Sequence, residues 1–158
     1  DNIRDAFILN DPENKAAYVE NANVYKKQIK EAITPLRDRI MKIAPQQRWL
    51  VSCEGAFSYF IHDFKMRELY LWPINADGQG TPQQIRRVID TVRKNNIPAV
   101  FCESTVSQSP AKQIAHETGS KYGGVLYVDS LTIATGKVPT YLDLLRVTSE
   151  TIVSGLEP

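Results

Sequence analysis

Acidic residues follow three apolar runs of the sequence. The runs read WLVSC, PAVFC and GVLYV, and they lead directly into Glu54, Glu103 and Asp129. The first acid is followed at once by Gly55, which indicates a turn. Oxygen ligands of this kind suit divalent cations, so the recurring pattern suggests a cation site.

Three ionised carboxylates gathered in one crevice would repel one another. Either one of them takes up a proton, with a raised pKa, or a cation holds them together. The alternative is that each acid only interacts with the N-terminus of the helix that follows its strand, as Asp and Glu often do. Recurrence after three separate runs favours the cation.

Histidine is the next metal ligand to seek, and the sequence has only His62 and His116. On a helical wheel of about 100° per residue, each falls away from the apolar face of its predicted helix. We therefore expect both to face solvent. Two or three oxygen donors are fewer than the four that a closed transition-metal site needs, so the remaining donors must be water or another lobe.

Short apolar runs alternate with helical patterns from Trp49 onwards. This alternation is typical of an α/β fold, here a four-stranded parallel sheet flanked by helices. The predicted strands are 49–53, 68–72, 98–102 and 124–128, and the predicted helices are 57–65, 82–95, 110–119 and 139–155. Ligands of open parallel sheets bind beyond the carboxyl ends of the strands, where the three acids are expected to converge.

A long helix is predicted before the first strand. Asp11-Pro12-Glu13 is typical of a helix start, and an apolar stripe with steps of three and four residues continues to Ile43. The stripe predicts a helix of about 30 residues, roughly 45 Å long, with Pro35 inside it and Pro45 at its end. Such a helix outruns a compact domain and should pack against something else. A coiled-coil stalk is the alternative.

Composition fits one globular domain, because the 158 residues are 42% hydrophobic and 23% charged. A net charge of +1 without a basic run gives nucleic acid or an anionic membrane little to bind. No apolar stretch approaches the roughly 18 residues that cross a bilayer. The first residues do not have the pattern of a leader, so we expect a chain that is mature, cytoplasmic or cut from something longer.

Several ordered segments resemble a known family. SCEGAFSYF, YLWPINADGQGTPQQI, FCESTVSQSPAKQIAHETG and YVDSL look like the carboxy-terminal lobe of the cluster A solute-binding proteins of ABC transporters, which bind manganese, zinc or iron. NDPENKAAYVENA is similar to the start of the helix that links the two lobes of these proteins. The resemblance implies that Glu54 of SCEG and Asp129 of YVDS are metal ligands, completed by two histidines of an amino-terminal lobe.

That amino-terminal lobe has no counterpart in this sequence. The resemblance therefore implies an isolated piece of a longer protein, with an amino-terminal segment and interlobe helix at 1–46 and the metal-binding lobe at 47–158. Its implied role is to capture a divalent metal outside the cytoplasm, in the periplasm or an equivalent space, for an ABC permease in the membrane, without catalysing a reaction. The exposed stripe of the helix would favour self-association.

The donor types narrow the choice of metal. Carboxylates combined with imidazoles make a fairly hard site, which suits manganese(II) ahead of zinc(II), although zinc also binds such sites tightly. Glu103 is a candidate for orienting a ligand. Polar residues of the loop after the second predicted strand are candidates for lining the cleft: Asn75, Asp77 and Gln79. Trp72 and Pro73 are expected to shape the crevice.

Cys53 and Cys102 hold equivalent positions on two predicted neighbouring strands. Because such strands lie about 4.8 Å apart, the thiols could pair in an oxidising compartment. We expect instead two small buried thiols, which is the commoner state of lone cysteines.

Two other function classes use similar residues. An enzyme would use Cys102 as a nucleophile or the carboxylates as an acid/base pair, but neither histidine is placed to activate a thiol. A phosphoacceptor signalling domain also binds a divalent ion at strand ends, but the expected cluster of acids and later lysine are missing. Metal capture remains the preferred hypothesis.

Overall fold

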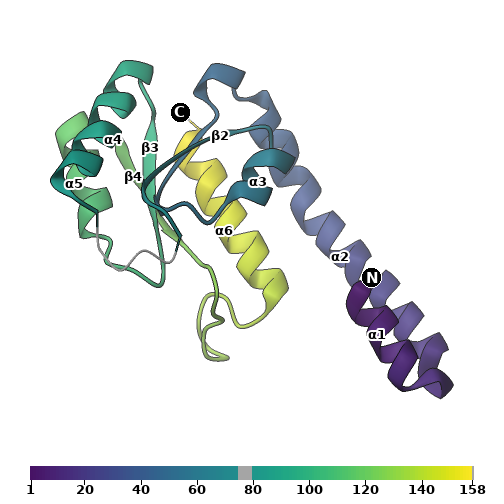
Figure 1. Ribbon diagram of the computed structural model, residues 1–158. Helices are drawn as coiled ribbons and strands as arrows, with labels where there is room; N and C mark the ends of the chain where they lie inside the picture. The colour runs from purple at the N-terminus through teal and green to yellow at the C-terminus, as the bar shows by residue number, and fades with distance from the viewer. Residues whose placement is uncertain (75–79, 158) are drawn as a thin grey trace.

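The computed structural model describes residues 1–74 and 80–157. Its amino-terminal part is a helical hairpin in which α1 (Asn2–Asn10) folds back on α2 (Lys15–Lys42), with a short 3-10 turn at Pro12–Asn14 between them. The rings of Phe7 and Tyr18 stack with centroids 5.4 Å apart. Figure 1 shows the hairpin projecting away from the rest of the molecule. The predicted long helix is confirmed, with 28 residues in α2.

The burial of α2 changes along its length. Leu36 and Ile40, near its C-terminal end, are buried, whereas Val24 and Tyr25 are 51% and 40% exposed. Pro35 lies within the helix, close to where burial begins. The first part of the predicted apolar stripe is therefore largely uncovered by the described residues.

Two pairs of parallel strands form the centre of the lobe. β1 (Trp49–Glu54) pairs with β2 (Arg67–Trp72), and β3 (Ala99–Glu103) pairs with β4 (Lys121–Leu126). The parallel α/β class is confirmed. The strands nevertheless form two two-stranded sheets rather than the single four-stranded sheet that was predicted.

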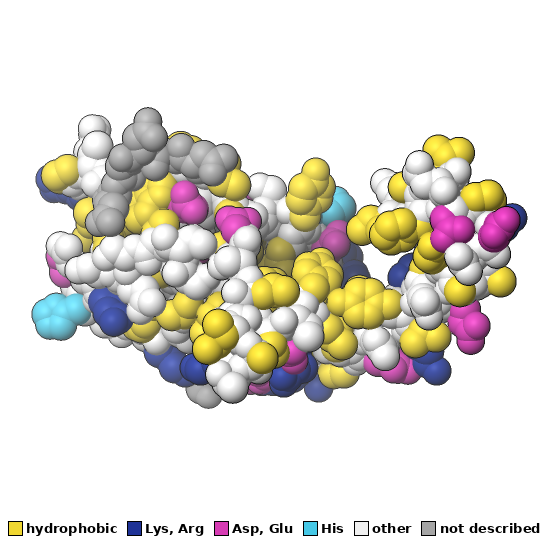
Figure 2. Space-filling model, turned by 90° about the horizontal axis from the view of Figure 1, so that it is seen from below, with side chains coloured by type: hydrophobic (Ala, Val, Ile, Leu, Met, Phe, Trp, Pro, Cys, Tyr) yellow, Lys and Arg dark blue, Asp and Glu magenta, His cyan; other side chains and the backbone are white. Residues whose placement is uncertain are grey.

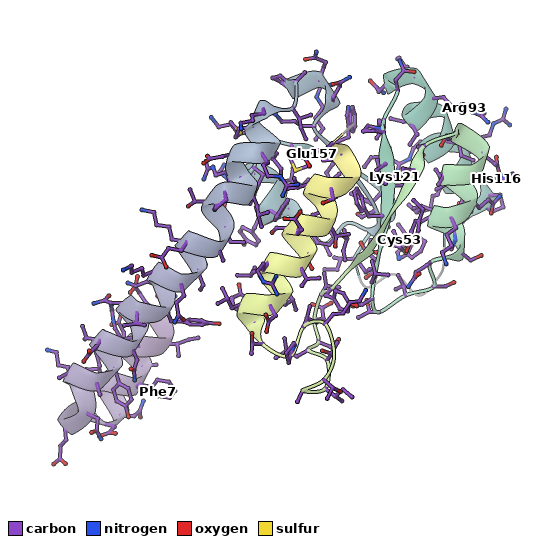
Figure 3. All side chains as sticks on the ribbon, turned by 180° about the vertical axis from the view of Figure 1, so that it is seen from behind. Phe7, Cys53, Arg93, His116, Lys121 and Glu157 are labelled. Carbon is purple, nitrogen blue, oxygen red and sulfur yellow. A yellow bond between two sulfur atoms is a disulfide. The ribbon has the colours of Figure 1, made fainter. Side chains whose placement is uncertain are left out.

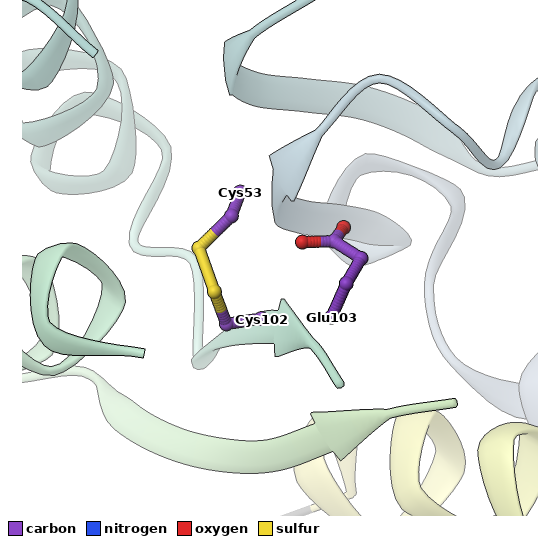
Figure 4. Close-up of side chains that lie close together, drawn as sticks. All are labelled: Cys53, Cys102 and Glu103. Carbon is purple, nitrogen blue, oxygen red and sulfur yellow. A yellow bond between two sulfur atoms is a disulfide. The ribbon is translucent and has the colours of Figure 1, made fainter. Parts of the chain in front are cut away.

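β1 and β3 lie side by side without a backbone ladder between them. At their ends, a disulfide and the side chain of Glu103 occupy the space between the strands (Figure 4). The side chain of Glu103 accepts a hydrogen bond from the backbone N–H of Glu54. In a continuous sheet, a backbone carbonyl of the neighbouring strand would accept this bond. This side-chain contact in place of a backbone one explains part of the missing ladder between β1 and β3.

Helices cover both faces of the strands. α4 (Pro82–Asn95) and α5 (Ser109–Thr118) lie on one face, while α3 (Ser58–Asp63), α6 (Tyr141–Leu156) and the end of α2 lie on the other (Figure 1). Strand residues alternate between the two cores. Val51 packs with the residues beneath α4 and α5, and Leu50 packs with those beneath α2 and α6.

Charged contacts connect α2 to α6. The guanidinium group of Arg39 donates to both carboxylate oxygens of Glu157 at 2.9 and 2.6 Å, and to Glu150 at 2.8 and 2.9 Å. In Figure 3, Glu157 is labelled at the end of α6, beside α2. In the ranges 1–74 and 80–157, none of the helices is both long and apolar enough to traverse a bilayer.

Candidate metal-binding edge

Glu54 and Glu103 end the two central strands next to each other. Each is the last residue of its strand, whereas the sequence placed it one position beyond. The N–H of Glu54 donates to Oε2 of Glu103 at 3.2 Å. After Glu54 the chain turns through Gly55, where a Cβ atom would lie 2.9 Å from the ring of Tyr70. A glycine here lets the chain pass close to that ring.

The side chain of Glu103 is completely buried. The pKa of Glu103 is raised to about 7, chiefly by loss of hydration. Backbone N–H donors, including that of Glu54, act in the opposite direction, and the nearby Glu54 carboxylate contributes to the rise. Its Oε1 atom has no hydrogen-bond partner among the described residues. Such a carboxyl group is partly protonated at neutral pH, and positive charge close to it would favour the ionised form.

Cys53 and Cys102 form a disulfide, with Cα atoms 5.0 Å apart. The expectation of two free buried thiols is therefore wrong. The alignment of β1 with β3 brings the two residues within the Cα separation that a disulfide requires. The bond lies one residue before Glu54 on one strand and one before Glu103 on the other.

The sulfur atoms do not provide a metal site. Within the part of the chain that the structure describes, the one group of three ligand-type residues with atoms inside 4.8 Å of each other is Cys53, Cys102 and Glu103. A metal ion binds the thiolate form of cysteine, which a disulfide lacks. Carboxylate oxygens are consequently the metal donors that this edge offers.

Asp129 lies in a tight turn beyond β4. The strand ends at Leu126, two residues earlier than predicted, so Asp129 is separated from it by Tyr127 and Val128. The N–H of Ser130 donates to the carbonyl of Val128 at 2.7 Å, and Asp129 between them has φ of +59°. This three-residue turn places a non-glycine residue in a costly left-handed conformation. Strained backbone of this kind clusters at functional sites.

The segments that carry Glu54 and Asp129 lie at the same edge of the strands. β1 and β3 end together, and Glu103 is in register with Leu126 of β4. Figure 2 looks onto this edge and shows acidic side chains close together among hydrophobic ones. The three acids do not come together as closely as the ligands of one metal ion. Among the described residues, no three carboxylates have oxygen atoms within 4.8 Å of one another.

A family model described as "ZnuA: Zinc-uptake complex component A periplasmic" matches residues 1–155. The chain belongs to the ZnuA family. This is the group of metal-binding ABC solute-binding proteins that the sequence motifs resemble, and it is a family of binding proteins rather than enzymes.

Curated relatives in this family carry names of different metals. The chain is 54% identical over 155 residues to the "Iron-binding protein YfeA" of Yersinia pestis, with 98% of this chain and 50% of the relative covered. It is 33% identical to the "Manganese-binding lipoprotein MntA" of Halalkalibacterium halodurans, covering 98% of this chain and 51% of that protein. The chain therefore spans about half the length of the curated relatives it matches.

Solved structures of periplasmic metal-binding proteins share the fold. A manganese-bound periplasmic metal-binding protein from Candidatus Liberibacter asiaticus is 47% identical, with a TM-score of 0.92 over 99% of this chain and 57% of the other. The periplasmic zinc-binding protein TroA of Treponema pallidum has a TM-score of 0.87 at 17% identity over 99% of this chain and 58% of the other, a likeness of fold alone.

The other residues singled out in this ZnuA-family sequence have varied positions. His62 and His116 are exposed, as predicted, and Figure 3 labels His116 on the outer side of α5. Trp72 is buried and in register with Glu54, whereas Pro73 is exposed. The predictions for Asn75, Asp77 and Gln79 lie outside the described residues.

Thr148 was missed by the sequence analysis. It is a buried residue of α6 whose hydroxyl donates to the carbonyl of Tyr127 at 3.1 Å and accepts from the N–H of Tyr127 at 3.0 Å. The available signal was a polar Thr148-Ser149 pair in the middle of an otherwise apolar helix face. That signal does not reveal which backbone group the hydroxyl contacts.

Proposed function

We propose that this chain forms one side of a site that captures a divalent transition-metal ion, with Glu54 and Asp129 as its ligands. The observation that carries the proposal is the arrangement of the strand edge. Glu54 is the last residue of a largely buried strand and Asp129 occupies a strained turn, both at the edge where ligands of parallel sheets bind. ZnuA-family membership supports a metal as the cargo.

Electrostatics at this edge favour a cation. The carboxylate of Glu54 adds to the rise in the pKa of Glu103, because its negative charge disfavours a second negative charge on Glu103. A doubly charged ion bound by Glu54 would relieve this repulsion. The carboxylate oxygens fit such an ion as ligands, and the remaining donors would come from an amino-terminal lobe of the same protein.

We propose manganese(II) as the cargo ahead of zinc(II). Hard carboxylate oxygens suit manganese(II). Zinc(II) has a higher intrinsic affinity for such sites, because affinity rises along the first transition row. The supply of each metal ion therefore contributes to which one is bound. The relatives named above include iron-binding and manganese-binding proteins, which agrees with a site tolerant of several divalent ions.

Glu103 would support Glu54 rather than bind the ion itself. Its carboxylate holds the backbone N–H of Glu54, and groups that orient a metal ligand affect affinity less than the ligand does. Replacing Glu103 with Gln should therefore weaken metal binding less than replacing Asp129 with Ala. The opposite order would remove this role from Glu103.

The division of the chain follows from this function. Residues 1–46 would contribute the helix that links two lobes, and 47–158 would form the carboxy-terminal metal-binding lobe. The loaded protein would work outside the cytoplasm and deliver its ion to an ABC permease in the membrane, with no chemical reaction of its own. Neither an enzyme nor a phosphoacceptor domain is favoured by the family.

Metal binding by this chain and by the intact two-lobe protein tests the proposal. Calorimetry with Mn²⁺ and Zn²⁺ should give tight binding to the intact protein and much weaker binding to the chain, because the chain lacks imidazole donors at the edge. Asp129→Ala and Glu54→Ala should each weaken binding in the intact protein. An intact protein that takes up no Mn²⁺ would end the assignment to manganese, and unchanged binding in both variants would end the assignment of the ligands.

A further inference from the structure

Beyond β4 the chain leaves the sheet, and α6 becomes its support. The last ladder contact of this region runs from the N–H of Ser104 to the carbonyl of Leu126 at 2.8 Å. At the next residue both backbone groups of Tyr127 bond to one side chain, the hydroxyl of Thr148. A hydroxyl group can donate one hydrogen bond and accept others, so the single side chain of Thr148 satisfies both backbone groups of Tyr127.

The contact lies two residues before Asp129. Tyr127 is followed by Val128, whose carbonyl closes the turn onto the N–H of Ser130 around Asp129. A left-handed non-glycine residue persists only when its surroundings hold it there. Thr148 is 6% exposed and lies on a regular helix, so it gives this turn a rigid anchor on its amino-terminal side.

We infer that Thr148 is a positioning residue for the metal ligand Asp129. By holding both backbone groups of Tyr127, its hydroxyl fixes where the turn begins and hence where the Asp129 carboxylate lies relative to Glu54. This inference rests on the proposed function. It assigns to α6 a part in metal affinity that is separate from its packing against the strands.

Paramagnetic Mn²⁺ provides a direct test in this chain. Bound Mn²⁺ broadens the amide NMR signals of nearby residues, so titration of the nitrogen-15-labelled chain yields an apparent affinity even when binding is weak. Thr148→Val, which keeps the shape but lacks the hydroxyl, should weaken Mn²⁺ binding about tenfold, as expected for a group that orients a ligand. Thr148→Ser, which keeps the hydroxyl, should bind as the original chain does.

Thr151→Val is the matched control. Thr151 is on the same helix, but its hydroxyl bonds to the carbonyl of Val147 within α6 at 2.8 Å and does not contact the turn. This variant should bind Mn²⁺ normally. If Thr148→Val does not fold, Thr148→Ala and Thr148→Ser make the same comparison, since they differ only in the hydroxyl.

The outcomes separate the two proposals. Weaker binding in Thr148→Val with normal binding in Thr148→Ser and Thr151→Val supports the inference, and faster hydrogen exchange of the Tyr127 amide in metal-free Thr148→Val should accompany it. Normal binding in Thr148→Val together with weak binding in Asp129→Ala overturns the inference and leaves the function standing. Normal binding in Asp129→Ala overturns both.

Discussion

The backbone N–H of Glu54 donates a hydrogen bond to the buried carboxylate of Glu103, 3.2 Å away on the neighbouring strand. One residue earlier on each strand, the Cys53–Cys102 disulfide joins the same two strands. A side chain and a covalent bond thus replace a backbone ladder where the candidate ligand Glu54 emerges. The hydrogen bond and the disulfide that join the ends of β1 and β3 can each be removed by one amino-acid substitution.

The stability of the metal-free chain should depend on pH through Glu103. The pKa of this group is raised from 4.5 to about 7 by burial, so its stabilising effect is complete below pH 4.5 and is lost as pH rises towards 7. At about 1.4 kcal/mol per pKa unit, the loss amounts to about 3 kcal/mol across this window. Urea unfolding between pH 4.5 and 8 measures it.

Glu103→Gln removes this titration while keeping the shape of the side chain. The variant should resemble the original chain near pH 4.5 and exceed it in unfolding free energy above pH 7. Two stability curves that stay parallel over the whole range would contradict a raised pKa at Glu103.

Removal of the disulfide should cost substantial stability. The bond closes a loop with a sequence separation of 49 residues, which the chain-entropy model values at about 4 kcal/mol. Replacing Cys53 and Cys102 together with Ser should lower the unfolding free energy by about this amount in urea. A thiol assay under denaturing, non-reducing conditions should find no free thiol in the original chain. Two titratable thiols would show that the strands are not bonded.

Asp129 should lower the stability of the chain through its backbone conformation while its carboxylate contributes to metal binding. Its φ of +59° suits glycine, so Asp129→Gly should be about 1 kcal/mol more stable than Asp129→Ala, which keeps a Cβ in the same conformation. Both variants lack the carboxylate and should lose Mn²⁺ binding alike in titrations. Equal stability of the Gly and Ala variants would mean that the turn relaxes without strain.

The contact between α2 and α6 should contribute modest, salt-sensitive stability. Arg39→Met removes hydrogen bonds to Glu150 and Glu157, but all three side chains are a third or more exposed, so we expect a small loss of thermal stability that shrinks in high salt. Lys27→Met on the same helix removes a looser 3.8 Å pair with Glu31 and should change thermal stability very little. Equal effects in the two variants would show that the paired geometry is unimportant.

Sequence patterns predicted that Glu54 and Glu103 lie at the same edge, because each follows an apolar run and ligands of parallel sheets bind beyond the carboxyl ends of the strands. The same patterns misplaced the end of β4. GVLYV is apolar through Val128, but β3 ends at Glu103, so the backbone of Tyr127 has no strand to pair with and bonds to Thr148. Apolar content indicates burial, and it does not tell which partner satisfies the backbone.

The state of the cysteines was also beyond sequence reasoning. Equivalent positions on adjacent strands allow either thiols or a disulfide, and the outcome depends on how closely β1 and β3 approach at that point. The separation of 5.0 Å between the Cα atoms of Cys53 and Cys102 is a property of the packed strands. Exposure of both histidines, in contrast, followed from helical periodicity, because each lies away from the apolar side of its helix.

Pro35 has a mechanical consequence for the projecting hairpin. Its ring removes one backbone hydrogen bond from α2 about 20 residues from Lys15, which corresponds to an arm of roughly 30 Å. A bend of about 10° at this point would move the far tip by about 5 Å. A small change of angle at Pro35 would therefore become a large displacement of the tip of the hairpin.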